Sequence, residues 1–406
     1  MKLYSLRRRH FQLSIALGLV ALFVRLAFVV FYPASSLAGG DPTAYWTFAQ
    51  SIAAGDGFRS SFEPWLADRP PFYPYFLAGV FLLFGESRTL VFMIQALFGS
   101  IAAVAFYLCA ARLLDDARAL PAGTLFALCP HFLLFTNQIL TETIYVVLVT
   151  LLLTAILLPE MRRRMMFLHA VLIGGLLGLI ALTRREAILP IGLLTVVLLW
   201  LRLWPDRRRF AIATIGLALA VVLALTPWLV RNQRVLGKPV LSSSAGINFM
   251  VGNNPLAAGG YTPPPAAWDA ALSGVGELER NRLAWQLSLQ WIRTDPQAYM
   301  RLLFLKLQVL FGPAHNLVLD GFDLLLIPLY ILGLLHLGHR EENWPAFAAL
   351  IGALVGGIVL IALIFVGGWR YRLIIYPALL LLAAYGLPIS WRILGKRPIV
   401  KEMQSY

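Results

Sequence analysis

The chain has 406 residues, of which 59% are apolar and only 13% are charged. Soluble globular proteins carry about 25% charged residues, so the composition excludes a soluble enzyme, a disordered chain and a small disulfide-built domain. The 34 Lys and Arg residues exceed the 20 Asp and Glu residues and give a net charge of +14, which we interpret as a membrane-topology signal because no nucleic-acid-binding module is visible.

Long apolar runs predict an all-α, polytopic membrane protein with about ten transmembrane helices. Both termini are expected in the cytoplasm, because this places the basic clusters 112–118, 162–164, 202–209 and 392–401 inside. The short apolar segments 72–84 and 302–311 are then interfacial or re-entrant. The predicted spans lie near 11–31, 88–111, 117–135, 139–158, 165–183, 187–203, 211–231, 317–337, 346–366 and 371–391.

Two large external loops, 32–87 and 232–316, are rich in Gly, Pro, Asn and aromatic residues and are expected to carry short surface helices. They divide the chain into three parts. Residues 1–231 form an N-terminal transmembrane module with a catalytic first external loop, 232–316 an external region with interfacial helices, and 317–406 the C-terminal transmembrane helices with a cytoplasmic tail.

Asp41 opens the first loop's predicted surface helix, in which Tyr45 and Phe48 recur at helical spacing over residues 43–54. Because Asp41 directly precedes Pro42, one interpretation is a helix N-cap followed by proline at the first helical position. The other is a carboxylate held at the membrane surface as a general base. The two interpretations are compatible.

Glu142 follows a tight external turn and lies in the first turn of the next predicted helix. The helix dipole favours an acid there, but an acid this close to hydrocarbon is costly and marks a functional site. Arg69 stands before Pro70 and Pro71, where it either snorkels to lipid headgroups or binds a lipid phosphate.

Arg184 and Arg185 are exceptions to the positive-inside rule, because the predicted topology places them outside. Such an exception requires an anionic partner, which is either Glu186 or Glu142 within the protein or a bound phosphate.

Arg370 and Arg372 form a second external basic exception, beside Trp369 and Tyr371. They are interpreted either as an aromatic-belt anchor or, together with the other external arginines, as a pocket for a phosphate-bearing lipid.

Motifs for nucleotide and metal chemistry are absent from the sequence: it has no zinc-ligand spacing, P-loop, dinucleotide fingerprint or G-x-S-x-G elbow. We therefore predict no metal site and no certain cofactor, and a divalent metal is unsupported. An enzyme on the outer face has no nucleotide supply, so these absences agree with a lipid-linked substrate.

The ordered motifs resemble the GT-C superfamily of polytopic glycosyltransferases that use polyprenyl-phosphate-linked sugars. Within it, the chain resembles the glycosyltransferase family 39-like clan of protein O-mannosyltransferases and lipid A aminoarabinose transferases. The resemblance covers most of the chain and rests on Asp41-x-x-x-Tyr45, Arg69-Pro70-Pro71, Leu140-Thr141-Glu142, Leu182-Thr183-Arg184, 226–232, Gly246-Ile247-Asn248, Gly252-Asn253-Asn254-Pro255 and Arg370-Tyr371-Arg372.

This resemblance implies an inverting sugar transfer from a polyprenyl-phosphate-linked donor. The short chain and its basic bias suit a bacterial inner membrane protein, so we expect an undecaprenyl-phosphate-like donor at the periplasmic face. The acceptor class stays open among lipid, polysaccharide and protein. Asp41 would act as general base, and Glu142 matches the superfamily's second acidic residue. Substrate would be bound by Tyr45, Arg69, Arg184, Arg185, Arg231, Asn253, Arg370 and Arg372, although Arg231 is also explained as the end of a span.

Two features of the sequence depart from the relatives. Pro42 follows Asp41, so the acidic pair of protein O-mannosyltransferases is missing, and Arg69 replaces the lysine common before the prolines in aminoarabinose transferases. The sugar and the acceptor therefore stay open. The alternatives are a transporter or flippase for a lipid-linked sugar, and a transferase that ligates polymers or acyl groups.

Overall fold

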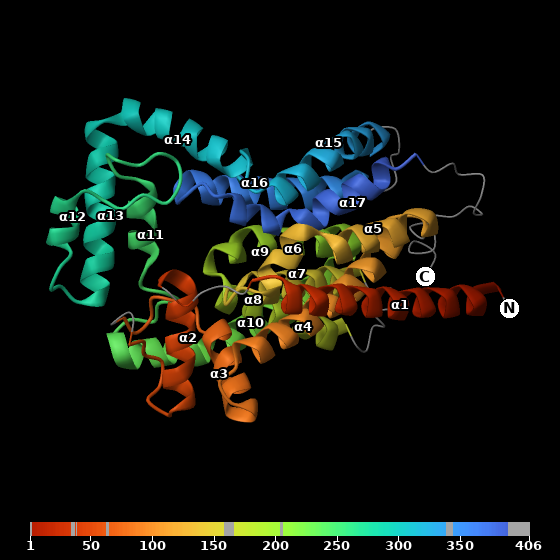
Figure 1. The fold of residues 1–406 in the computed structure, drawn as a ribbon, viewed down its shortest axis with the longest axis horizontal. Coiled ribbons are helices and arrows are strands. Elements are labelled where there is room, and N and C mark those ends of the chain that lie inside the picture. Colours follow the sequence, from red (N-terminus) through yellow and green to blue (C-terminus); the bar gives the residue numbers. More distant parts are fainter. Residues whose placement is uncertain are drawn as a thin grey trace.

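The computed structural model describes residues 2–33, 37, 39–61, 65–157, 166–203, 206–337 and 344–388. This part of the chain is all-helical, as the sequence predicted, and contains no strand. Figure 1 shows long helices side by side along the long axis of the molecule. The surface helices gather at one end, opposite the N-terminal end of the first helix.

The N-terminal half contains the first nine helices and one 3₁₀ turn. They are α1 (Lys2–Phe31), α2 (Gly40–Ala53), α3 (Phe72–Phe84), α4 (Arg88–Leu113), α5 (Asp116–Leu128), α6 (Pro130–Thr136), α7 (Glu142–Leu157), α8 (Met166–Thr183), η1 (Arg185–Ala187) and α9 (Ile188–Leu203). Within it, α1 packs on α4, and α4 on α7.

The C-terminal half begins with a long helix that leads into the external region. Its elements are α10 (Arg207–Leu236), α11 (Ala245–Gly252), α12 (Ala266–Ala271), α13 (Glu277–Thr294), α14 (Pro296–Phe311), α15 (Leu317–Leu337), α16 (Trp344–Ile364), η2 (Trp369–Ile374) and α17 (Tyr376–Gly386). Helix α10 packs along α8, where Gly174 and Gly178 let the backbones approach closely.

Five described helices are long and apolar enough to cross a membrane, and a sixth span results if α5 and α6 are joined across their 41° bend. Four further apolar helices are shorter, among them α3, whose bounds match the predicted interfacial segment 72–84. The chain is thus a multi-pass membrane protein, and the predicted count of ten spans is not confirmed. The basic clusters 162–164 and 392–401 lie outside the described residues.

The start of α2 corrects one interpretation of the sequence. Asp41 is not the N-cap, because Gly39 occupies that position with φ of 119°. The side chain of Thr43 accepts the backbone hydrogen bond from Gly39 at 2.8 Å. Asp41 lies inside the first turn, and its carboxylate is therefore free to make a tertiary contact.

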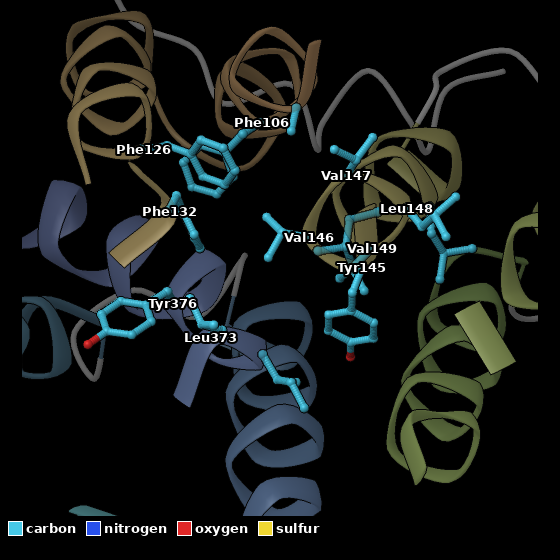
Figure 2. Close-up of a cluster of buried hydrophobic side chains, with 14 of the residues drawn as sticks. Phe106, Phe126, Phe132, Tyr145, Val146, Val147, Leu148, Val149, Leu373 and Tyr376 are labelled. Carbon is cyan, nitrogen blue, oxygen red and sulfur yellow. The ribbon is translucent and has the colours of Figure 1, made fainter. Parts of the chain in front are cut away.

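An aromatic core lies between α4, α5, α6 and α17 (Figure 2). Phe126 stacks on Phe106 with 4.5 Å between ring centroids and contacts Phe132 at the same separation. Tyr376 of α17 closes the cluster against Phe132. Within a membrane such rings stabilise the bundle mainly through van der Waals packing, and this core joins α4, α5, α6 and α17.

Candidate functional site

Five charged residues from separate parts of the chain converge where the surface helices meet the bundle. Asp41 comes from α2, Arg69 from the segment before α3, Glu142 from the start of α7, Arg184 from the α8–η1 junction and Arg370 from η2. We call this set the carboxylate–arginine site. Asp68 adds a third carboxylate beside it, with its Oδ2 3.2 Å from Arg69 Nε, so three guanidinium groups face three carboxylates.

Asp41 is the accessible acid of the site, with 35% of its side chain exposed. Its Oδ1 accepts a hydrogen bond from Arg69 Nη1 at 2.6 Å, and its Oδ2 lies 3.6 Å from Arg370 Nη1. Burial raises the pKa of Asp41, but the guanidinium groups of Arg69 and Arg370 outweigh it, so the pKa lies below the ordinary aspartate value. Asp41 is consequently ionised at neutral pH.

Glu142 is the buried acid, with only 2% of its side chain exposed. Its Oε1 accepts hydrogen bonds from Arg370 Nη2 at 2.6 Å, Arg370 Nε at 3.0 Å and Arg184 Nη2 at 2.9 Å. Arg184 Nε also donates to the hydroxyl of Thr141 at 3.0 Å. Arg370 therefore bridges Glu142 to Asp41, and the intramolecular partner of Arg184 is Glu142.

Tyr45 and Arg185 support the site from its edges. The guanidinium of Arg69 lies 5.6 Å from the centroid of the buried Tyr45 ring, which positions Arg69 by a cation–π contact. Arg185 has serines as hydrogen-bond partners: its Nη1 donates to the hydroxyls of Ser242 and Ser244, the latter at 3.0 Å. Both serines donate to the carbonyl of Asp68, so Arg185 ties the external region to the first loop.

Three other candidate residues contact different groups of the protein. Arg231 donates to the carbonyls of Leu66 and Phe58 and lies inside α10, which continues beyond it to Leu236. Asn253 donates to the carbonyls of Phe249 and Ile364. Arg372 donates to Asp323 at 3.4 Å. Their predicted substrate contacts remain predictions.

Asp323 lies at the centre of a second polar cluster, which we did not predict from the sequence. It accepts hydrogen bonds from Tyr376 at 2.7 Å and is 3.0 Å from His131 Nε2. The sequence does contain a signal for this cluster, because Asp323 interrupts an otherwise apolar run and an acid there requires a partner.

Lys306 is a second buried polar residue that we did not predict from the sequence. It is fully buried, and its Nζ donates to Asn253 Oδ1 at 2.7 Å and to the carbonyl of Leu363 at 2.9 Å. These bonds fasten α14 and α11 to the end of α16, just before the segment that carries Arg370. Burial lowers the pKa of Lys306 to about 7.

Stability should depend on pH through Lys306. Between pH 7 and 10.5 the unfolded chain binds a proton that the folded chain does not, so stability rises with pH across this range. We expect the melting temperature in detergent to rise from pH 7 toward pH 10 more steeply for the wild type than for Lys306→Met. Parallel curves would contradict this assignment.

The described residues contain no group of three or more His, Cys, Asp and Glu side chains that could hold a metal ion. The carboxylates of the carboxylate–arginine site are instead neutralised by guanidinium groups. The chemistry that this arrangement offers is anion binding beside an accessible carboxylate.

Comparisons with known proteins agree with this architecture. Residues 68–230 match the family model described as dolichyl-phosphate-mannose-protein mannosyltransferase, a segment that includes Arg69, Glu142 and Arg184. No curated protein sequence matches the chain. The oligosaccharyltransferase AglB from Archaeoglobus fulgidus, solved with an inhibitory peptide and a dolichol-phosphate, is similar in structure over 94% of this chain, with a TM-score of 0.57 and 15% identity. The chain has the GT-C fold.

A second structure of the archaeal oligosaccharyltransferase, in the apo form, matches with a TM-score of 0.54 and 14% identity over 93% of this chain. This GT-C chain spans about half the length of both archaeal structures, of which 50% is covered. ArnT from Cupriavidus metallidurans, in the apo state, matches with a TM-score of 0.43 and 17% identity over 93% of this chain and 77% of that one.

The pairing of Arg69 with Asp41 makes a prediction about pH. Replacing Arg69 by Gln removes the nearest positive charge and raises the pKa of Asp41. If ionised Asp41 is needed for turnover, the acid limb of the pH profile of kcat/KM moves to higher pH in Arg69→Gln. Arg59→Gln, an exposed change on the same loop, should leave the limb in place. Coincident limbs in the two variants would exclude Asp41 as the titrating group.

Proposed function

We propose that the chain is a membrane glycosyltransferase that transfers a sugar from a polyprenyl-phosphate donor, of the undecaprenyl-phosphate kind, to an acceptor hydroxyl at the periplasmic face. One observation carries the proposal. An accessible, ionised Asp41 lies beside Arg69 and Arg370, and the side chain of Arg370 is 38% exposed. A base for the acceptor and a site for an anionic leaving group are thus adjacent.

The exposed guanidinium of Arg370 suits the donor's phosphate. A sugar linked through a phosphodiester carries one negative charge, and its phosphate gains a second as it departs. Fixed guanidinium groups stabilise this developing charge more in the transition state than in the ground state, which is the condition for catalysis. Arg370, with 38% of its side chain exposed, is the most accessible of the three arginines, and we assign it the phosphate contact.

The proposed step is a single displacement. The acceptor oxygen attacks the anomeric carbon as its proton passes to Asp41, and the bond from that carbon to the phosphate oxygen breaks. The bonding electrons leave with the polyprenyl phosphate, and the configuration at the anomeric carbon inverts. Glu142 is too buried to meet an acceptor, so we assign it the task of holding Arg184 and Arg370.

The likeness to known proteins supports a lipid-phosphate donor. The archaeal AglB structure was solved with a dolichol-phosphate and a peptide, and the matched family is described by a dolichyl-phosphate-linked mannose. Both names refer to a phosphate-linked lipid carrier, which supports a donor of the polyprenyl-phosphate class. The acceptor stays within lipid, polysaccharide and protein.

The test uses purified chain in proteoliposomes with a panel of polyprenyl-phosphate-linked sugars and candidate acceptors. Transfer is measured as released polyprenyl phosphate and as glycosylated acceptor, and donor flipping is measured separately by quenching of a labelled donor. We expect released carrier and product in equal amounts, with inverted anomeric configuration. Flipping without release of carrier would refute the proposal in favour of a flippase.

A further inference from the structure

Arg25 lies in the last two turns of α1 (Lys2–Phe31), with only 1% of its surface exposed. Its Nη1 donates to the carbonyls of Ala21 at 3.2 Å and Ala127 at 3.0 Å. Its Nε and Nη2 are also buried, and they donate to no acceptor among the described residues. Arginine stays protonated in proteins, and a charged group in a membrane interior is costly and marks function.

A small pocket, with a cavity volume of about 10 Å³, lies beside Arg25 and also reaches Glu142. Its lining is otherwise mostly apolar and includes Phe126, Phe132 and Val146, which are labelled in Figure 2. Glu142 contributes a second unsatisfied group, because its Oε2 is buried and accepts no hydrogen bond within the described part of the chain. The unsatisfied donors of Arg25 and the unsatisfied acceptor of Glu142 therefore belong to residues that line the same pocket.

A water molecule matches both walls of this pocket. It accepts from Arg25 and donates to Glu142 Oε2, whereas an anion would suit Arg25 but be repelled by the carboxylate. Buried waters typically make about three hydrogen bonds to polar groups that would otherwise be unsatisfied. The pocket has room for one such molecule.

We propose that Arg25 is a positioning residue of the carboxylate–arginine site and acts on Glu142 through a water molecule held in this pocket. The inference rests on the proposed function for its effect on turnover, but not for the water itself. Arg184 and Arg370 hold Oε1 from the external side, and Arg25 holds Oε2 from the membrane interior. Glu142 is then fixed from both sides, and with it the arginine that reaches Asp41.

The neighbouring helix leaves space for this arrangement at Gly99 of α4. A Cβ at position 99 would lie 2.6 Å from Arg25 Nε and 3.1 Å from its Cδ, so Gly99→Ala must displace the guanidinium. At Gly175, in contrast, an added Cβ would meet nothing within 4 Å. Gly175→Ala is therefore a matched control for an added methyl group within a helix.

The water is tested directly by electron cryomicroscopy of the full chain in lipid nanodiscs, at a resolution that shows ordered waters. We expect a density peak within hydrogen-bond distance of both Glu142 Oε2 and Arg25 Nε or Nη2. A pocket without ordered density, or a guanidinium in direct contact with the carboxylate, would overturn the proposal. This result does not depend on any transfer assay.

The role in turnover is tested with Arg25→Met and Arg25→Lys. Arg25→Met should lower kcat roughly 10-fold, because small displacements of a catalytic array are costly, while KM for the donor stays within a factor of two or so. Its thermal stability should be unchanged or higher, since an apolar side chain replaces a buried cation. Arg25→Lys should recover most of the rate, and Gly99→Ala should lose rate where Gly175→Ala does not.

Three results would overturn the positioning role: wild-type kcat in Arg25→Met, no recovery in Arg25→Lys, or loss of rate and stability in parallel. Failure of the proposed function is distinguishable, because the wild type itself would then transfer no sugar while the structural test still decides on the water.

Discussion

Asp41→Asn should abolish sugar transfer, with kcat reduced about 10³-fold, within the range for loss of a general base. The amide keeps the shape of the side chain and its hydrogen bond from Arg69, but it cannot take the acceptor's proton. Donor affinity should stay near the wild-type value or increase, because the substitution removes a negative charge beside the arginines that would bind the phosphate. Turnover with saturating donor and equilibrium binding of the donor measure the two effects separately.

The matched control is Asp56→Asn, which makes the same change at an exposed position after α2. It should leave turnover and donor affinity unchanged. Transfer by Asp41→Asn at more than a tenth of the wild-type rate would exclude Asp41 as the base, and loss of donor binding would instead indicate a role in substrate recognition.

Glu142→Gln should damage both stability and activity. Arg184 and Arg370 would lose the charge of their shared partner, and breaking a buried ion pair costs about 3 kcal/mol or more; the 38% exposure of Arg370 keeps the expected cost at the low end of the range. Transfer should fall about 100-fold, because displacing groups that position the reactants has effects of that size. Thermal unfolding in detergent and single-turnover kinetics check the two effects.

Glu186→Gln serves as the control for Glu142→Gln, because it removes the same charge in η1, next to Arg185, without touching the bonds to Glu142 Oε1. We expect small effects on stability and rate. Equal losses in the two variants would mean that only the total charge of the region matters, and that Glu142 does not hold the arginines individually.

Three members of the site could be picked out from the sequence because they break rules of membrane topology. Arg184 and Arg370 stand where the positive-inside rule disfavours arginine, and Glu142 is an acid at the edge of hydrocarbon. Their pairing was not predictable, since Glu142 and Arg370 lie 228 positions apart in the chain. Only the packing of α7 against η2 decides it.

Arg370 and Arg372 are close in sequence but have different partners in the structure. Arg370 and Arg372 lie in the 3₁₀ turn η2, where residues two apart point about 120° away from each other. Arg370 therefore reaches Glu142, whereas Arg372 reaches Asp323. The fold class and the surface helices α2 and α3 followed from apolar periodicity and proline positions, which are local; the partners of the buried Lys306 depend on contacts between distant segments.

The central claim is best tested by transfer of radiolabelled sugar from polyprenyl phosphate in membrane vesicles that contain the wild-type chain or Asp41→Asn at equal expression. The account predicts label on the acceptor with the wild type and none above background with the variant, while both retain the donor. Equal transfer by the two, or none by the wild type with any donor of the panel, would contradict it.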